Sequence, residues 1–177
     1  MTALVITTNY GVEQDELLAP LTALKEAGVP VTVAAPNADP IQTLVSDKDP
    51  GQTVDPNVSL ADVDPADYDV LVVPGGTINA DTLRTDESAV SLAQTFARDG
   101  KTIASICHGP WLLAEAELTE GKTMTSYPSL ETDLRNAGAT WVDEELAECP
   151  AHGWTLLTSR NPDDLDAFSG AVVKAAA

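Results

Sequence analysis

The feature that most constrains this chain is the apolar run at residues 103–106, which ends at Cys107 and is followed by His108, Gly109 and Pro110. An uncharged run of this length predicts a buried strand, and the Gly-Pro pair predicts the start of a helix. Where a strand passes directly into a helix, the residue at the corner is held at the end of the sheet. The sequence therefore predicts a nucleophile elbow with Cys107 at its corner.

A thiol at such a corner faces a helix N-terminus, whose partial positive charge favours the thiolate. The pKa of free cysteine, about 8.5, falls to roughly 3.5–7.5 in such places. We therefore expect a lowered pKa for Cys107 and a nucleophilic role. The alternative is that Cys107 is a small buried hydrophobic side chain. The adjacent His108 and the helix start favour the nucleophile.

The rest of the chain alternates strand patterns with amphipathic helical patterns. Strands are predicted at residues 3–8, 29–35, 69–73, 101–106, near 123 and at 154–159, with helices at 14–28, before about 99, at 129–137 and from 162. This alternation predicts an α/β fold, with residues 1–177 forming a single-domain, flavodoxin-like, three-layer sandwich. Right-handed crossovers would give a mostly parallel sheet with helices on both faces. Residues 36–68 predict an irregular or hairpin excursion, and residues 74–80 predict a loop.

Three loops are expected to meet at one edge of this sheet. Glu13, the pair Gly75 and Gly76, and Cys107 all follow predicted strand ends. In open α/β sheets, ligands bind outside the carboxyl ends of the strands. The sequence therefore places one candidate site at that edge.

The stretch ASICHGP at residues 104–110 resembles the signature of the PfpI-type intracellular peptidases. Their superfamily, DJ-1/PfpI, has the class I glutamine amidotransferase-like fold and also contains the parkinsonism-associated deglycase, glyoxalase-III-like enzymes and certain chaperones. Further segments match in the same order, at residues 11–17, 73–76, 121–128, 136–143 and 158–165. The resemblance covers almost the whole chain. Because this superfamily uses one site for several chemistries, it implies the fold more specifically than the reaction.

The resemblance also implies roles for the charged residues. The glutamate that matches Glu13 contacts the nucleophilic sulfur, so Glu13 is expected to stay protonated beside it and to move protons. Glu16, one turn further on, is either a supporting group or a solvated one. In the PfpI branch, His108 would form a dyad with Cys107, although a residue next to the nucleophile is not expected to reach its sulfur easily. A neighbouring subunit supplies an acid to that dyad, and Asp81 lies near the matching position.

Backbone and phenol donors complete the expected site. The N–H groups of Gly75 and Gly76 could form an oxyanion hole with that of His108, or the pair could be a plain turn. Tyr127, in the TSYP segment, matches a site tyrosine and could donate to a substrate oxygen. Its alternative is a packing role.

These residues predict a cofactor-free, cysteine-dependent stress enzyme that acts on reactive carbonyls, of the glyoxalase-III or deglycase type. One alternative is an oligomeric intracellular cysteine peptidase, and another is a redox-sensing or holdase protein oxidised at Cys107. The substrate would be a small carbonyl compound or a peptide. Family members self-associate, so we expect a dimer or a higher oligomer, up to a hexamer.

Other site types are disfavoured by spacing. No phosphate-binding glycine motif occurs, and no histidine or cysteine spacing suits a metal, so no metal or cofactor is expected. Class I glutamine amidotransferases need a distant His-x-Glu pair, and His152 is not followed by an acid at that spacing. Cys149, flanked by acidic residues, is expected to be structural.

The charge of the chain excludes further classes. Twenty-eight acidic and nine basic residues give a net charge of −19, spread over every segment. Nucleic acid is a poor partner because phosphate binding needs clustered Lys and Arg. No run reaches the roughly 18 apolar residues of a membrane span, and no signal peptide is recognisable, so a cytoplasmic location is expected. The acidic coat resembles that of proteins from halophiles.

The acidic coat predicts a dependence on salt. Molar salt reduces the Debye length to about 3 Å and screens repulsion between surface carboxylates. We expect the melting temperature to rise between dilute buffer and molar KCl, measured by circular dichroism. An unchanged or falling melting temperature over this range would contradict the halophile hypothesis.

Overall fold

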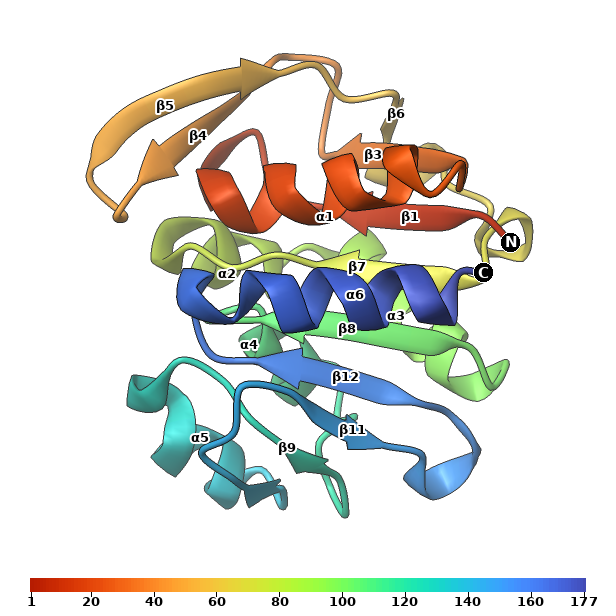
Figure 1. The fold of residues 1–177 in the computed structure, drawn as a ribbon, viewed down its shortest axis with the longest axis vertical. Coiled ribbons are helices and arrows are strands. Elements are labelled where there is room, and N and C mark those ends of the chain that lie inside the picture. Colours follow the sequence, from red (N-terminus) through yellow and green to blue (C-terminus); the bar gives the residue numbers. More distant parts are fainter.

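The computed structural model describes residues 1–177, and its centre is a seven-stranded sheet in the order β11-β12-β8-β7-β1-β3-β6 (Figure 1). Its strands are β1 (Ala3–Ile6), β3 (Val31–Ala35), β6 (Val58–Ser59), β7 (Val70–Val73), β8 (Thr102–Ile106), β11 (Ala147–Cys149) and β12 (Leu156–Ser159). All neighbours are parallel except β11, which runs antiparallel to β12 at the edge. Every residue of β1 and β7 is buried, because both faces of the central strands are covered.

Helices cover both faces of this sheet. The helices are α1 (Gln14–Glu26), α2 (Thr77–Leu83), α3 (Glu87–Arg98), α4 (Pro110–Glu115), α5 (Glu131–Asn136) and α6 (Leu165–Ala175). In Figure 1, α1 and α6 lie side by side on the near face, and α3 and α4 lie behind the sheet. Leu17 and Phe168 belong to the near hydrophobic cluster, and Phe96 and Leu113 to the far one. The predicted α/β sandwich with a mostly parallel sheet is confirmed.

The excursion at residues 36–68 contains a hairpin. Strands β4 (Ile41–Val45) and β5 (Asp49–Val54) pair antiparallel, and β4 also pairs with β2 (Tyr10–Glu13), which the sequence analysis assigned to a loop. The hairpin turn contains Ser46 and Asp47, both with positive φ, at 55° and 54°. Positive φ at both central residues is the turn geometry that matches the twist of paired strands. Lys48 N closes the turn by donating to Val45 O at 3.2 Å.

Smaller elements complete the fold. Strands β9 (Thr123–Met124) and β10 (Thr140–Trp141) form a two-stranded parallel pair, and short 3-10 helices occupy Leu60–Asp62, Pro65–Asp67, Pro128–Leu130, Ala151–Gly153 and Pro162–Asp164. Residues 74–80 are not entirely a loop, because α2 begins at Thr77. No helix is both long enough and apolar enough to cross a membrane.

The end of β1 is fixed to the loop after β7 by Asn79, which is fully buried on α2. Its Oδ1 accepts from Thr7 Oγ1 at 2.8 Å, from Thr8 N at 2.7 Å and from Thr8 Oγ1 at 2.9 Å. Its Nδ2 donates to Gly75 O at 2.9 Å. The amide therefore sets the position of the Gly75 backbone relative to the first strand.

We predict that Asn79→Leu destabilises the protein, because it leaves Thr8 N buried without an acceptor. The expected loss is about 1–3 kcal/mol, the cost of leaving buried polar groups unpaired. Urea unfolding in molar KCl measures it, with Ile78→Ala as the control, because Ile78 is a neighbouring side chain that is 44% exposed. Equal unfolding free energies for Asn79→Leu and the wild-type protein would contradict this role.

Candidate active site

The predicted elbow is present. Cys107 directly follows β8 and has a φ of 60°, a strained conformation for a residue with a side chain. Its N donates to Ser159 O at 3.1 Å, and its O accepts from Tyr127 N at 2.8 Å. Gly109 lets the chain turn, since a Cβ there would lie 2.6 Å from Val73 O. The backbone on both sides of Cys107 is thus fixed by neighbouring segments.

The glycine loop after β7 lies directly against this elbow. A Cβ on Gly75 would lie 2.5 Å from Glu16 Oε2 and 2.8 Å from the Cys107 Cβ, so no side chain fits. Gly76 has a φ of 85°, and a Cβ there would meet the backbone of Gly11. Gly75 N donates to Glu16 Oε2 at 2.9 Å, so it is not free for an oxyanion. The N–H groups of Gly76 and His108, in contrast, lower the pKa of the Cys107 thiol, so they favour negative charge on its sulfur.

The carboxyl group beside the thiol belongs to Glu16. Glu16 is fully buried beside the Cys107 side chain, which influences its pKa, and its Oε1 has no hydrogen-bond partner. Burial raises the pKa of Glu16 from 4.5 to about 8, against the opposing effect of its bonds to Cys107 and Gly75. At neutral pH the carboxyl is therefore protonated and can donate to the sulfur.

The prediction that Glu13 makes this contact is therefore corrected. Glu13 is the last residue of β2, and its carboxylate accepts from Ser46 N at 3.1 Å and from Asp47 N at 3.0 Å. Glu16 has a helical signal that the sequence analysis did not use. It lies on the buried face of α1 with Leu17, Pro20 and Leu24, whereas Glu13 precedes the helix.

His108 reaches the sulfur of its neighbour, contrary to the sequence-based expectation. Its Nδ1 lies 3.1 Å from Cys107 Sγ, because the positive φ of Cys107 turns both side chains toward the same pocket. The His108 ring stacks on Tyr127, with centroids 4.7 Å apart, and meets Trp111 edge-on. Burial lowers the pKa of His108, so the ring is neutral at pH 7 and can accept the thiol proton.

The expected low pKa of the thiol is not found. Burial raises the pKa of Cys107, and the negative charge available on Glu16 raises it further. The N–H groups of Gly76 and His108 oppose these effects. Cys107 is therefore a thiol with a base at hydrogen-bonding distance, and its reactivity depends on transfer of its proton to that base.

These groups line one pocket of about 360 Å³, formed by Glu13, Glu16, Ser46, Asp47, Thr77, Cys107, His108, Tyr127 and Pro162. Tyr127 is 41% exposed at this pocket, where donation to a substrate oxygen stays a prediction. Four of the lining residues were not singled out from the sequence as site residues: Ser46, Asp47, Thr77 and Pro162. Asp47 lies in a turn of a weakly patterned segment, and nothing in its local sequence indicates the pocket.

The remaining candidates lie elsewhere. Asp81 is exposed on α2 and does not line the pocket, so its role in a neighbouring subunit stays a prediction. Cys149 is buried in β11, where its Sγ accepts from Thr123 N at 3.3 Å, in keeping with a structural role. His152 is exposed in a short 3-10 helix.

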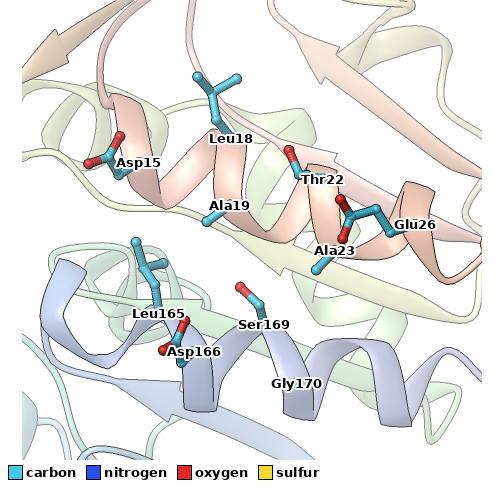
Figure 2. Close-up of a pocket in the computed structure, with 10 residues that line it drawn as sticks. All are labelled: Asp15, Leu18, Ala19, Thr22, Ala23, Glu26, Leu165, Asp166, Ser169 and Gly170. Atoms are coloured by element: carbon cyan, nitrogen blue, oxygen red, sulfur yellow. The ribbon is translucent and has the colours of Figure 1, made fainter.

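A larger hollow of about 680 Å³ lies between α1 and α6 (Figure 2). Small side chains, including Ala19, Ala23 and Ser169, form its floor, and Asp15 and Glu26 lie along α1. It contains neither cysteine nor histidine. The smaller pocket around Cys107 is therefore the candidate active site.

Comparison with known proteins agrees with this fold. A sequence model of the DJ-1/PfpI family matches residues 1–175. The chain belongs to the DJ-1/PfpI family. It is 37% identical to General stress protein 18 of Bacillus subtilis over 166 residues, covering 94% of this chain and 92% of that one.

Two further members of the DJ-1/PfpI family illustrate the similarity. Deglycase TK1284 of Thermococcus kodakarensis is 36% identical over 174 residues, which cover 98% of each chain. The crystal structure of Drosophila melanogaster DJ-1beta superposes with a TM-score of 0.87 at 31% identity, covering 100% of this chain and 91% of that one. The family assignment thus rests on both sequence and fold.

The raised pKa of Glu16 predicts how the stability of this DJ-1/PfpI protein depends on pH. Between 4.5 and about 8 the folded protein holds a proton on Glu16 that the unfolded chain has lost. Its unfolding free energy should therefore fall with rising pH in this window, by up to about 1.4 kcal/mol per pH unit relative to Glu16→Gln. Glutamine keeps the hydrogen-bonding shape of the protonated acid but does not titrate. Parallel pH profiles of the two proteins in urea unfolding would contradict the raised pKa.

Proposed function

We propose that this protein is a cofactor-free, cysteine-dependent enzyme that converts small dicarbonyl compounds into hydroxy acids. The observation that carries the proposal is the setting of the Cys107 sulfur between a base and an acid. The neutral ring of His108 lies 3.1 Å away, and the protonated carboxyl of Glu16 lines the same pocket beside the Cys107 side chain. Deglycase TK1284 among its relatives supports carbonyl chemistry of this kind.

The reaction would begin with attack of Cys107 on the aldehyde carbon. His108 Nδ1 takes the thiol proton, and the aldehyde oxygen is protonated, which gives a hemithioacetal. The hydrogen on the former aldehyde carbon then moves to the neighbouring carbonyl oxygen, forming an enediol. The hydroxyl on the carbon bonded to sulfur then loses its proton, and the other enediol carbon gains one, which gives a thioester. Water hydrolyses the thioester to the hydroxy acid and the free thiol. The net change is the addition of one water.

The two groups beside the sulfur have complementary tasks in these steps. Glu16, protonated at rest, gives a proton to an oxygen and then, as a carboxylate, can take one from carbon. His108 holds the thiol proton while the C–S bond exists. The N–H groups of Gly76 and His108 stabilise negative charge on sulfur when it leaves.

The charge of the pocket favours neutral dicarbonyl substrates. Glu13, Glu16 and Asp47 line it, and no lysine or arginine does. A substrate that carries its own carboxylate would meet repulsion without a cation to offset it. The same repulsion favours release of the hydroxy acid product.

The proposal predicts that the purified protein in molar KCl converts methylglyoxal to lactate faster than it converts 4,5-dioxopentanoate, a dicarbonyl that carries a carboxylate, to 2-hydroxyglutarate. Formation of lactate and of 2-hydroxyglutarate is measured by chromatography. Cys107→Ser should abolish both while leaving the melting temperature unchanged. Cys149→Ser serves as the matched control, because Cys149 lies outside the pocket.

Cleavage of a fluorogenic peptide with no methylglyoxal turnover would overturn the proposal in favour of a peptidase. Oxidation of Cys107 by peroxide with no turnover of either substrate would overturn it in favour of a redox sensor.

A further inference from the structure

We propose that Asp47, acting through the Thr77 hydroxyl, orients His108 and stabilises its protonated ring, and that it does so within a single subunit. Asp47 and Thr77 are positioning residues, since neither touches the sulfur. The inference deepens the proposed function and rests on it in treating Cys107 as the nucleophile.

A continuous set of contacts connects Asp47 to the sulfur. Asp47 Oδ2 accepts from Thr77 Oγ1 at 2.8 Å, and Asp47 Oδ1 accepts from Thr77 N, also at 2.8 Å. Thr77 Oγ1 lies 3.4 Å from His108 Nε2, and His108 Nδ1 lies 3.1 Å from Cys107 Sγ. Both oxygens of the carboxylate are therefore engaged by one residue, whose hydroxyl faces the far side of the imidazole.

The donors and acceptors in this set have one consistent direction. The Thr77 hydroxyl has a single hydrogen, which it donates to the Asp47 carboxylate. Its oxygen is then an acceptor for the Nε2–H of His108. That hydrogen bond fixes the tautomer in which Nδ1 has a free lone pair toward the thiol. When Nδ1 takes the thiol proton, the positive ring faces Asp47 through one hydroxyl, and the carboxylate stabilises it.

Glu13 holds Asp47 in this position. The β4–β5 turn places Ser46 and Asp47 in the left-handed region, where residues with side chains are strained. The Glu13 carboxylate accepts from the N–H groups of both residues. The acid that the sequence pointed to as the partner of the sulfur thus holds the turn that carries Asp47.

The charged groups around His108 leave Asp47 as the one that reaches the far side of the ring. Cys107 and Glu16 lie on the Nδ1 side, Tyr127 stacks on its face, and Asp47 is the group whose charge raises the pKa of His108. Trp111 also meets the ring edge-on, and the Arg84 guanidinium lies over the Trp111 ring. Because Thr77 already occupies Nε2, an acid from a second subunit would have to displace it.

Alkylation of Cys107 by iodoacetamide, a neutral probe, tests the proposal without requiring turnover. Asp47→Asn and Thr77→Val should each slow labelling at pH 7 by about tenfold, the value of one hydrogen bond to a charged group. Thr77→Ser keeps the hydroxyl and should restore the wild-type rate. The double variant Asp47→Asn/Thr77→Val should be no slower than either single variant, because the two residues act in series.

The direction of the change in labelling rate in Asp47→Asn distinguishes this positioning role from a direct through-space effect of the Asp47 charge on the thiol. An acid that acted only through space would hold the thiol protonated, so its removal would speed up labelling. Asp49→Asn, on the same hairpin and exposed, is the matched control and should label at the wild-type rate. Melting temperatures within a few degrees of wild type identify the variants whose rates are compared.

The outcomes divide as follows. Faster or unchanged labelling in Asp47→Asn, or additive losses in the double variant, overturns the proposal. Slowed labelling in Asp81→Asn together with a wild-type rate in Asp47→Asn overturns it in favour of an acid from another subunit. Slowed labelling in Asp47→Asn and Thr77→Val, with no methylglyoxal turnover by the wild-type protein, supports the positioning role and refutes only the proposed function.

Discussion

The site depends on the close approach of the glycine loop to the elbow, with the Glu16 carboxyl buried between them. Gly75 has no room for a side chain, and its N–H is the donor that fixes one oxygen of Glu16. The other oxygen is buried and has no hydrogen-bond partner. Burial therefore keeps a proton on the acid at neutral pH, and this proton removes the repulsion that a second charge beside the sulfur would create.

The same burial keeps Cys107 in its protonated thiol form before a substrate binds. Cys107 and Glu16 together avoid two negative charges, and their protons belong to the pair rather than to either residue. A reagent that forms a bond to sulfur changes this balance, because the proton can pass to His108 as the bond forms. Such a site is selective for electrophiles small enough to enter the pocket.

The sequence was sufficient for the fold and for the elbow at Cys107, since both depend on local patterns. The strand before Cys107 and the helix after it can be recognised from residues adjacent in the sequence, namely the apolar run and the Gly-Pro pair. The structure has the elbow at this point. The choice between Glu13 and Glu16 depends on the helical periodicity of α1. Leu17, Pro20 and Leu24 place Glu16 on the buried face, whereas the motif match alone points to Glu13. Asp47 could not be found this way. Its place in the pocket depends on the pairing of β4 with β2, a contact between segments 30 residues apart in the chain whose pattern is weak.

The β4–β5 hairpin lies outside the seven-stranded sheet, and most of β5 is exposed to solvent. The elbow, in contrast, follows β8, which is buried from Ile103 to Ile106. Elements with few buried contacts open at a lower free energy than the core, so the two halves of the site belong to parts of the molecule with different local stabilities. A fluctuation that detaches the hairpin would leave the cysteine in place and would disconnect it from its acid. The thiol would then remain in place in an unreactive form, and its reactivity would depend on whether the hairpin is docked.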